Sequence, residues 1–114
     1  MTRPSSAECS NALFQYDILR SAWTELSAYS EGVPPSPRTQ LGFAEYGGSL
    51  YVFGGKDSEN SVLQDTFRFE IATMVWTELT TLVRGFTPPP RADHCFISAL
   101  DALFVWGGFD LNGK

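Results

Sequence analysis

The chain of 114 residues repeats itself with a period of 53, and this repeat limits the possible folds more than any other feature. LYVFGGKD at residues 50 to 57 returns as LFVWGGFD at residues 103 to 110, and WTEL at 23 to 26 returns at 76 to 79. Aligning residues 11–61 on 64–114 without a gap gives 16 identical pairs in 51. Such a repeat indicates an architecture in which each unit buries its apolar face against the next unit.

Turn residues divide each repeat into short strand-like segments. Leu41 to Tyr46 and Leu50 to Phe53 flank Gly47-Gly48, which predicts a tight hairpin because primed turns need positive φ. Thr66 to Phe69 and Val75 to Leu79 alternate in character as strands do. We therefore expect an all-β fold with four strands per repeat and no helix longer than a turn.

Paired glycines and proline clusters separate the strand-like segments. Gly54-Gly55 and Gly107-Gly108 each follow an apolar run, and we interpret them as a strand end pressed against a neighbouring segment. Val33 to Pro37 and Thr87 to Pro90 lack the amide donors of a strand. These proline-rich stretches are predicted to connect one unit to the next.

Composition restricts the classes of partner and the compartment. A net charge of −5 with eight Lys and Arg residues argues against the basic stripe of a nucleic-acid-binding protein. Cys9 and Cys95 are too few for a disulfide framework, and no apolar run is long enough to span a membrane. We expect a cytoplasmic protein that binds neither nucleic acid nor membrane.

The residues do not form a pattern typical of a catalytic or metal site. His94 is the only histidine, and although Asp93 and Ser98 are near it in sequence, neighbours on a strand point to opposite faces. One His and two distant Cys make no zinc pattern. We expect no catalytic residues, no metal, no cofactor and no enzymatic activity.

The order of these motifs resembles the Kelch repeat. Pro-Arg, then Leu-Tyr-Val-Phe-Gly-Gly, then an aromatic strand and a tryptophan follow one another as in that family, and the similarity covers about residues 11 to 110. The resemblance implies a β-propeller, in which each four-stranded sheet is one blade around a central channel. The fold class expected is an all-β, Kelch-type β-propeller fragment with four-stranded antiparallel blades.

The resemblance also implies which positions are structural. Arg91 and His94 are similar to the Arg-x-x-His start of the innermost strand, whereas the first copy has Leu41 in place of the histidine. The other structural positions of the repeat include the double glycine, the aromatic residue of the third strand and the tryptophan of the fourth strand. The structural residues are Tyr16, Trp23, Arg38, Gly54, Gly55, Phe69, Trp76, Arg91, His94, Gly107 and Gly108.

The phase of the repeat predicts a half blade, a full blade and a half blade. The expected parts are an N-terminal tail at 1–10, third and fourth strands at 11–27, a complete blade at 38–79, first and second strands at 91–108, and a C-terminal loop at 109–114. A propeller needs at least about four blades to close. We therefore expect part of a longer propeller, or copies joined head to tail into a homo-oligomer that completes it.

The resemblance implies a protein-protein interaction module that binds a protein or peptide through blade loops. Such contacts tend to follow the innermost strand's arginine and the double glycine, and most of these positions differ between the two copies. The candidate partner-binding residues are Thr39, Gln40, Lys56, Asp57, Ser58, Ala92, Asp93, Phe109 and Asp110. The alternative is a fragment of a propeller enzyme of the galactose oxidase type, whose catalytic residues lie outside this chain.

Overall fold

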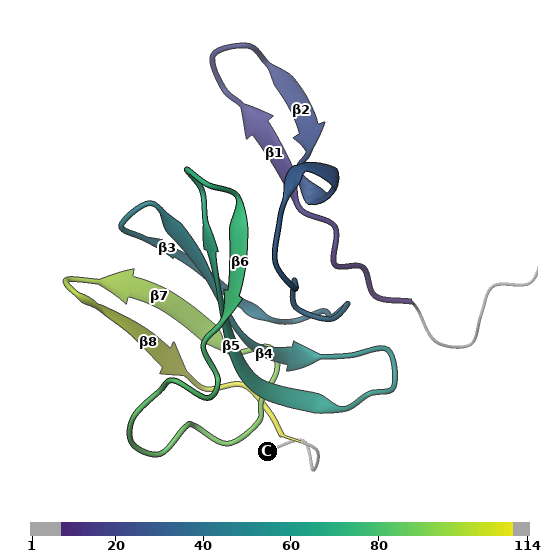
Figure 1. Ribbon diagram of the computed structural model, residues 1–114. Coiled ribbons are helices and arrows are strands. Elements are labelled where there is room, and N and C mark those ends of the chain that lie inside the picture. Colours follow the sequence, from purple (N-terminus) through teal and green to yellow (C-terminus); the bar gives the residue numbers. More distant parts are fainter. Residues whose placement is uncertain (1–7, 111–114) are drawn as a thin grey trace, which may run out of the picture.

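The chain forms three antiparallel sheets of two, four and two strands in a computed structural model that describes residues 8–110 (Figure 1). The strands are β1 Phe14–Asp17, β2 Ala22–Glu25, β3 Gly42–Tyr46, β4 Ser49–Lys56, β5 Val62–Glu70, β6 Val75–Glu78, β7 Cys95–Ala99 and β8 Ala102–Trp106. One 3₁₀ turn, η1 Ser27–Tyr29, follows β2. Within residues 8–110 no helix has the length and apolar character needed to cross a bilayer.

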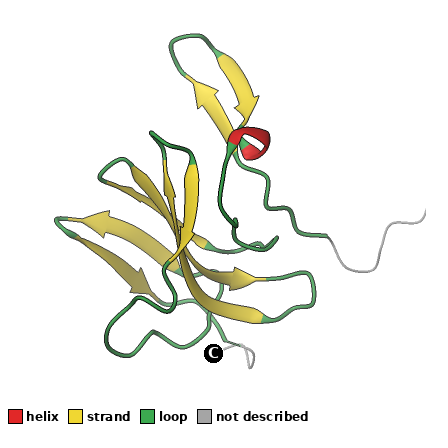
Figure 2. Ribbon diagram, in the orientation of Figure 1, coloured by secondary structure: helices red, strands yellow, loops and turns green. Residues whose placement is uncertain are grey.

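The complete sheet runs in the order β3-β4-β5-β6, as the repeat predicts for one full blade (Figure 2). Gly47 and Gly48 have φ angles of 59° and 80°, which the primed turn between β3 and β4 requires. Two-stranded sheets β1-β2 and β7-β8 flank it in sequence. The arrangement of a half blade, a full blade and a half blade is therefore present. The exact limits of the predicted segments stay a prediction. Residues 1–7 of the predicted N-terminal tail and 111–114 of the predicted C-terminal loop lie outside the described residues.

The double glycine Gly54-Gly55 lies inside β4, so the expectation that it ends this strand is wrong. The pairing of β4 with β5 shifts register between Phe53 and Gly55 and then continues to Lys56. A glycine with positive φ, here 68° at Gly54, allows an extra residue to bulge out while the ladder resumes beyond it. The second copy differs, because β8 ends at Trp106, before Gly107.

The core lies in the complete blade and consists of Val52, Phe67, Phe69 and Trp76. The rings of Phe69 and Trp76 lie 4.8 Å apart between centroids, on adjacent positions of β5 and β6. Leu13 and Leu26, at either end of the β1-β2 hairpin, pack against this cluster. The first half blade is thus anchored at its base, while the hairpin itself stands away from the other sheets (Figure 1).

The two edge strands of the complete blade, β3 and β6, contact different parts of the chain. Strand β3 packs beside β7 of the following half blade, and the Tyr46 hydroxyl donates a hydrogen bond of 2.5 Å to the Asp101 carboxylate. On the outer edge, Glu31 forms a parallel bridge to Val75 of β6. Gly32 adjoins this bridge with a φ of 83°, and a Cβ there would collide with the Trp76 carbonyl oxygen.

Equivalent residues of the two repeats differ sharply in exposure. Only 8% of the Trp76 surface is exposed, against 70% for Trp23, its counterpart on β2. Phe69 is fully buried, whereas its counterpart Tyr16 is exposed. Trp23 and Tyr16 were expected to pack between blades, whereas among residues 8–110 their hairpin forms a sheet of two strands and both side chains are exposed. Their packing role stays a prediction.

Candidate functional site

The predicted partner-binding residues lie together at one end of the blades. Thr39 pairs with Lys56 through two backbone hydrogen bonds of 2.8 Å, and Ala92 pairs with Phe109 at 3.0 and 2.9 Å, one repeat later. The Asp93 amide donates to the Gln40 carbonyl at 2.7 Å and so joins the two repeats. We call this surface the rim, and it comprises residues 39–40, 56–58, 92–93 and 109–110.

Most rim side chains reach solvent. Thr39, Gln40, Ser58 and Asp93 are exposed, while residues 56, 57, 109 and 110 are partly exposed. Gln40 and Asp93 occupy equivalent positions and both have left-handed backbone, with φ of 55° and 60°. Ala92 is fully buried, so its side chain cannot contact a partner, and this candidate is wrong for the side chain.

Asp57 organises the loop that follows β4. Its Oδ1 accepts hydrogen bonds from the amides of Glu59 and Ser61, each at 2.9 Å. The Ser61 carbonyl accepts a further bond from the Asp57 amide at 3.0 Å. The Asp57 carboxylate therefore fixes the shape of this rim loop, in addition to the solvated surface role expected for a loop carboxylate.

The two predicted structural arginines hold the glycine turns. Arg38 donates to the Gly54 carbonyl at 3.1 Å, and Arg91 donates to the Gly107 carbonyl at 3.0 Å. Arg38 also forms a bidentate pair with Asp65, with distances of 2.6 and 3.0 Å. Each guanidinium thus ties the segment before an inner strand to the double glycine that follows it in the chain.

Gly54 and Gly108 lie in close contact with the backbone of another segment, Gly54 with the next repeat and Gly108 within its own repeat. A Cβ on Gly54 would come within 2.7 Å of the Arg91 carbonyl oxygen, and one on Gly108 within 2.7 Å of the Ala92 carbonyl oxygen. Contacts below 3.0 Å leave no room for a side chain, so glycine is required at both places. The predicted close approach is present at Gly54, Gly55 and Gly108, whereas a Cβ on Gly107 would meet nothing within 4 Å, and Gly54 is not a strand end.

His94 joins the complete blade to the next half blade. Its Nε2–H donates to the Phe53 carbonyl at 3.0 Å, and its ring meets Phe53 edge to face with centroids 5.5 Å apart. Nδ1 is buried with no hydrogen-bond partner among the described residues. Burial lowers the pKa of His94 below its usual value, because it disfavours the charged ring. The hydrogen bond to the Phe53 carbonyl raises the pKa by a smaller amount. The polar contact of His94 is thus a structural one across the blades.

This pKa shift predicts that acid destabilises the protein. Since the folded-state pKa lies below the usual value of 6.5, the unfolded chain binds the proton first as pH falls. Stability should be complete above about pH 6.5 and decline below it, until the pH reaches the lowered pKa of the folded state. Urea unfolding at about pH 7.5 and about pH 5.5 measures this.

His94→Gln is the control for this titration, because glutamine retains a donor for the Phe53 carbonyl but does not titrate. His94 is the only histidine, so the variant should lose the stability difference between the two pH values. An equal decline in both proteins would assign the effect to other groups.

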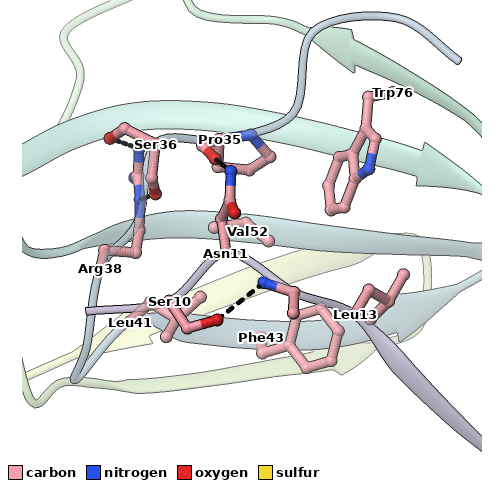
Figure 3. A pocket seen from close by; sticks show the side chains of 11 residues that line it. Ser10, Asn11, Leu13, Pro35, Ser36, Arg38, Leu41, Phe43, Val52 and Trp76 are labelled. Carbon is pink, nitrogen blue, oxygen red and sulfur yellow. Dashed lines mark hydrogen bonds between the residues drawn. The ribbon is translucent and has the colours of Figure 1, made fainter. Parts of the chain in front are cut away.

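A cavity of about 250 Å³ lies between the N-terminal segment and the complete blade (Figure 3). Leu13, Pro35, Phe43 and Val52 supply its apolar lining, and the Asn11 side-chain amide donates to the Pro35 carbonyl at 3.2 Å. The sequence gives no signal for this cavity, because the lining residues come from segments that meet only in the fold. Among the described residues no group of three or more His, Cys, Asp and Glu could hold a metal ion.

Known proteins support the same architecture. Residues 3–114 match the model of the KLHDC2/KLHL20/DRC7 Kelch-repeats domain. The chain is 41% identical over 78 residues to the human Rab9 effector protein with kelch motifs, covering 66% of this chain and 20% of that protein. It is 34% identical over 94 residues to acyl-CoA-binding domain-containing protein 5 of Arabidopsis thaliana, covering 82% of this chain and 14% of that protein.

A third relative is Ras guanine nucleotide exchange factor F of Dictyostelium discoideum, with 28% identity over 99 residues, 86% of this chain and 8% of that protein. The chain therefore spans a fifth or less of the length of these relatives. Kelch repeats are generally protein-protein interaction scaffolds, and Kelch-repeat homologues are typically binding modules without enzymatic activity. The match of the family model to residues 3–114, together with the four-stranded antiparallel blade, shows that this chain belongs to the Kelch-repeat family.

Proposed function

We propose that this chain is a protein-protein interaction module that binds a protein or peptide partner through the rim. The observation that carries the proposal is the hydrogen bond from the Asp93 amide to the Gln40 carbonyl, at 2.7 Å. This bond joins the loop residues of two successive repeats into one continuous surface. A partner could therefore contact both repeats at once.

The chemistry of the rim suits a polar peptide. Thr39, Gln40 and Asp93 offer exposed donors and acceptors, and Lys56 adds a positive charge. Phe109 supplies a partly exposed aromatic ring between the polar groups. Because the scaffold residues repeat while these residues vary, the rim is where the two repeats differ in what they present.

The name of one relative supports a protein partner. One relative is named as a Rab9 effector with kelch motifs, which describes a protein that acts through another protein. The alternative, a fragment of a propeller enzyme of the galactose oxidase type, places its catalytic residues outside this chain. No observation on the described residues favours that alternative.

Two charge-matched double substitutions, one on the rim and one at the opposite end of the blades, test this proposal. Thr39→Arg with Gln40→Arg places two bulky cations on the rim, and we expect at least about a tenfold loss of partner affinity. Ala72→Arg with Leu100→Arg adds the same charge at exposed turns of the opposite end and should leave affinity unchanged. Partners are captured by proximity labelling with wild type, then purified and titrated calorimetrically against each variant.

Two outcomes would contradict the proposal. Equal loss of affinity in both double variants would show that net charge and not the rim determines binding. A partner that binds the opposite end would be released by Ala72→Arg with Leu100→Arg alone. Circular dichroism of both variants verifies that each remains folded.

We also propose a cytoplasmic location. Cys9 and Cys95 are both free thiols, which suits a reducing compartment. Fluorescence microscopy of the tagged protein in its own cell tests this, and accumulation in a secretory compartment would contradict it.

A further inference from the structure

Ser36 directly precedes a proline in the segment between β2 and β3. Residues 33–36 belong to no strand, helix or turn. Pro35 is buried and anchors the segment, while Ser36 and Pro37 are exposed. The ring of Pro37 disfavours helical backbone at the residue before it, so Ser36 is held extended. An exposed serine before a proline on an extended segment is the acceptor that proline-directed kinases modify.

The exposure of Ser36 does not depend on which neighbouring sheet is complete. Its counterpart one repeat later, Pro89, is also exposed, although Pro89 follows the four-stranded sheet and Ser36 precedes it. The local geometry repeats as well. Arg38 Nε donates to the Ser36 carbonyl at 3.1 Å, and Arg91 Nε donates to the Pro89 carbonyl at the same distance. A complete blade before or after this position therefore leaves it exposed.

A buried guanidinium lies next to the Ser36 hydroxyl (Figure 3). Arg38 Nη2 donates to Ser36 Oγ at 3.1 Å and to Asp65 Oδ2 at 3.0 Å. Its Nη1 donates to Asp65 Oδ1 and to the Gly54 carbonyl. The Arg38 side chain is only 3% exposed, so its charge is weakly screened by water. The serine hydroxyl thus shares one nitrogen of a buried cation with a carboxylate.

We propose that Ser36 is a phosphorylation site of a proline-directed serine/threonine kinase, with Arg38 as the partner of the phosphate. In the transfer, Ser36 Oγ bonds to the γ-phosphorus of ATP, the bond from that phosphorus to ADP breaks, and the hydroxyl proton passes to the catalytic aspartate of the kinase. The phosphoserine carries a charge of about −1.5 to −2 at pH 7 and three acceptor oxygens. One of these oxygens takes the Nη2–H that Oγ accepts in the unmodified chain.

The phosphate and Asp65 then hold the same guanidinium. The new phosphate–guanidinium pair is charge-assisted and favourable, but the phosphate also repels the Asp65 carboxylate, which offsets the gain. If residue 65 is neutral, the repulsion is absent and the phosphate supplies the negative charge that the buried guanidinium needs. The effect of phosphorylation on stability therefore depends on the charge of residue 65. This consequence is independent of partner binding at the rim.

Treatment of the folded protein with ATP and a mitogen-activated protein kinase, which is proline-directed, tests whether Ser36 is an acceptor. Thr87 is the only other serine or threonine before a proline, and it is partly buried. Mass spectrometry of proteolytic peptides should locate phosphate on Ser36, and the Ser36→Ala variant should lack it. A folded protein that stays unmodified at Ser36 would overturn the proposal.

Urea unfolding before and after phosphorylation tests Arg38 as the partner. Asp65→Asn keeps an acceptor for the guanidinium but removes the charge. Phosphorylation should raise the urea midpoint of Asp65→Asn by about 0.5 M or more and should not raise that of wild type. In Asp65→Asn with Ser36→Ala, the same treatment can modify only Thr87 among these sites and should leave the midpoint unchanged. No rise in Asp65→Asn, or an equal rise in wild type or in the control, would overturn the proposal.

Discussion

Replacing Trp76 by alanine is expected to lower the free energy of unfolding by about 3 to 5 kcal/mol. The indole is 8% exposed and lies in the core with Phe69, Phe67 and Val52. Its removal would leave a cavity that the neighbouring strands cannot fill, since Phe69 is already held in the β5-β6 register. Urea unfolding followed by circular dichroism gives the difference.

Trp23→Ala is the matched control, because Trp23 occupies the equivalent position and is 70% exposed. The control should change stability by less than about 0.5 kcal/mol. If Trp76→Ala costs no more than Trp23→Ala, then Trp76 does not hold the core together.

Asp65→Ala is expected to cost about 3 kcal/mol, because it leaves a buried guanidinium without its carboxylate. The Arg38 side chain is 3% exposed and the Asp65 side chain 25%, with Nη1 and Oδ1 2.6 Å apart. The loss lies at the lower end of the range for buried pairs, since water reaches part of the carboxylate. Urea unfolding measures this loss.

The second repeat supplies a control for the Arg38–Asp65 pair. Arg91 donates to the carbonyls of Pro89 and Gly107, which are neutral acceptors. Arg91→Ala should therefore cost about 1 kcal/mol, the value of ordinary hydrogen bonds. Arg38→Met with Asp65→Leu should cost less than Asp65→Ala alone, because no charge is left buried. A neutral Asp65→Ala variant would show that the pair contributes little.

The features predicted from sequence are those with a local physical cause. The Gly47-Gly48 turn was predictable because positive φ selects glycine, and β6 was predictable from its alternating pattern around Trp76. The division into half, full and half blades follows from the repeat, since a period of 53 residues relates β1-β2 to β5-β6. Local signals and the period together determine most of the fold.

The features missed depend on contacts between distant segments. The bulge at Gly54-Gly55 could not be predicted, because it depends on the pairing of β4 with β5 beyond the glycines. The sequence around the glycines alone resembles a strand end. The full burial of Ala92, which pairs with Phe109, is not revealed by a small residue in a predicted loop. The exposure of Trp23 likewise depends on which strands are present beside it. Partner binding at the rim stays a prediction.

The bridge from Glu31 to β6 has a consequence for aggregation. The Glu31 amide donates to the Met74 carbonyl at 2.9 Å, and the Trp76 amide donates to the Glu31 carbonyl at 2.8 Å. The Met74 carbonyl and the Trp76 amide at the start of this outer edge are therefore already bonded, and a foreign strand cannot pair with them. Gly32 permits the chain to lie this close, so a side chain at that position would uncover the edge and favour sideways growth into fibrils.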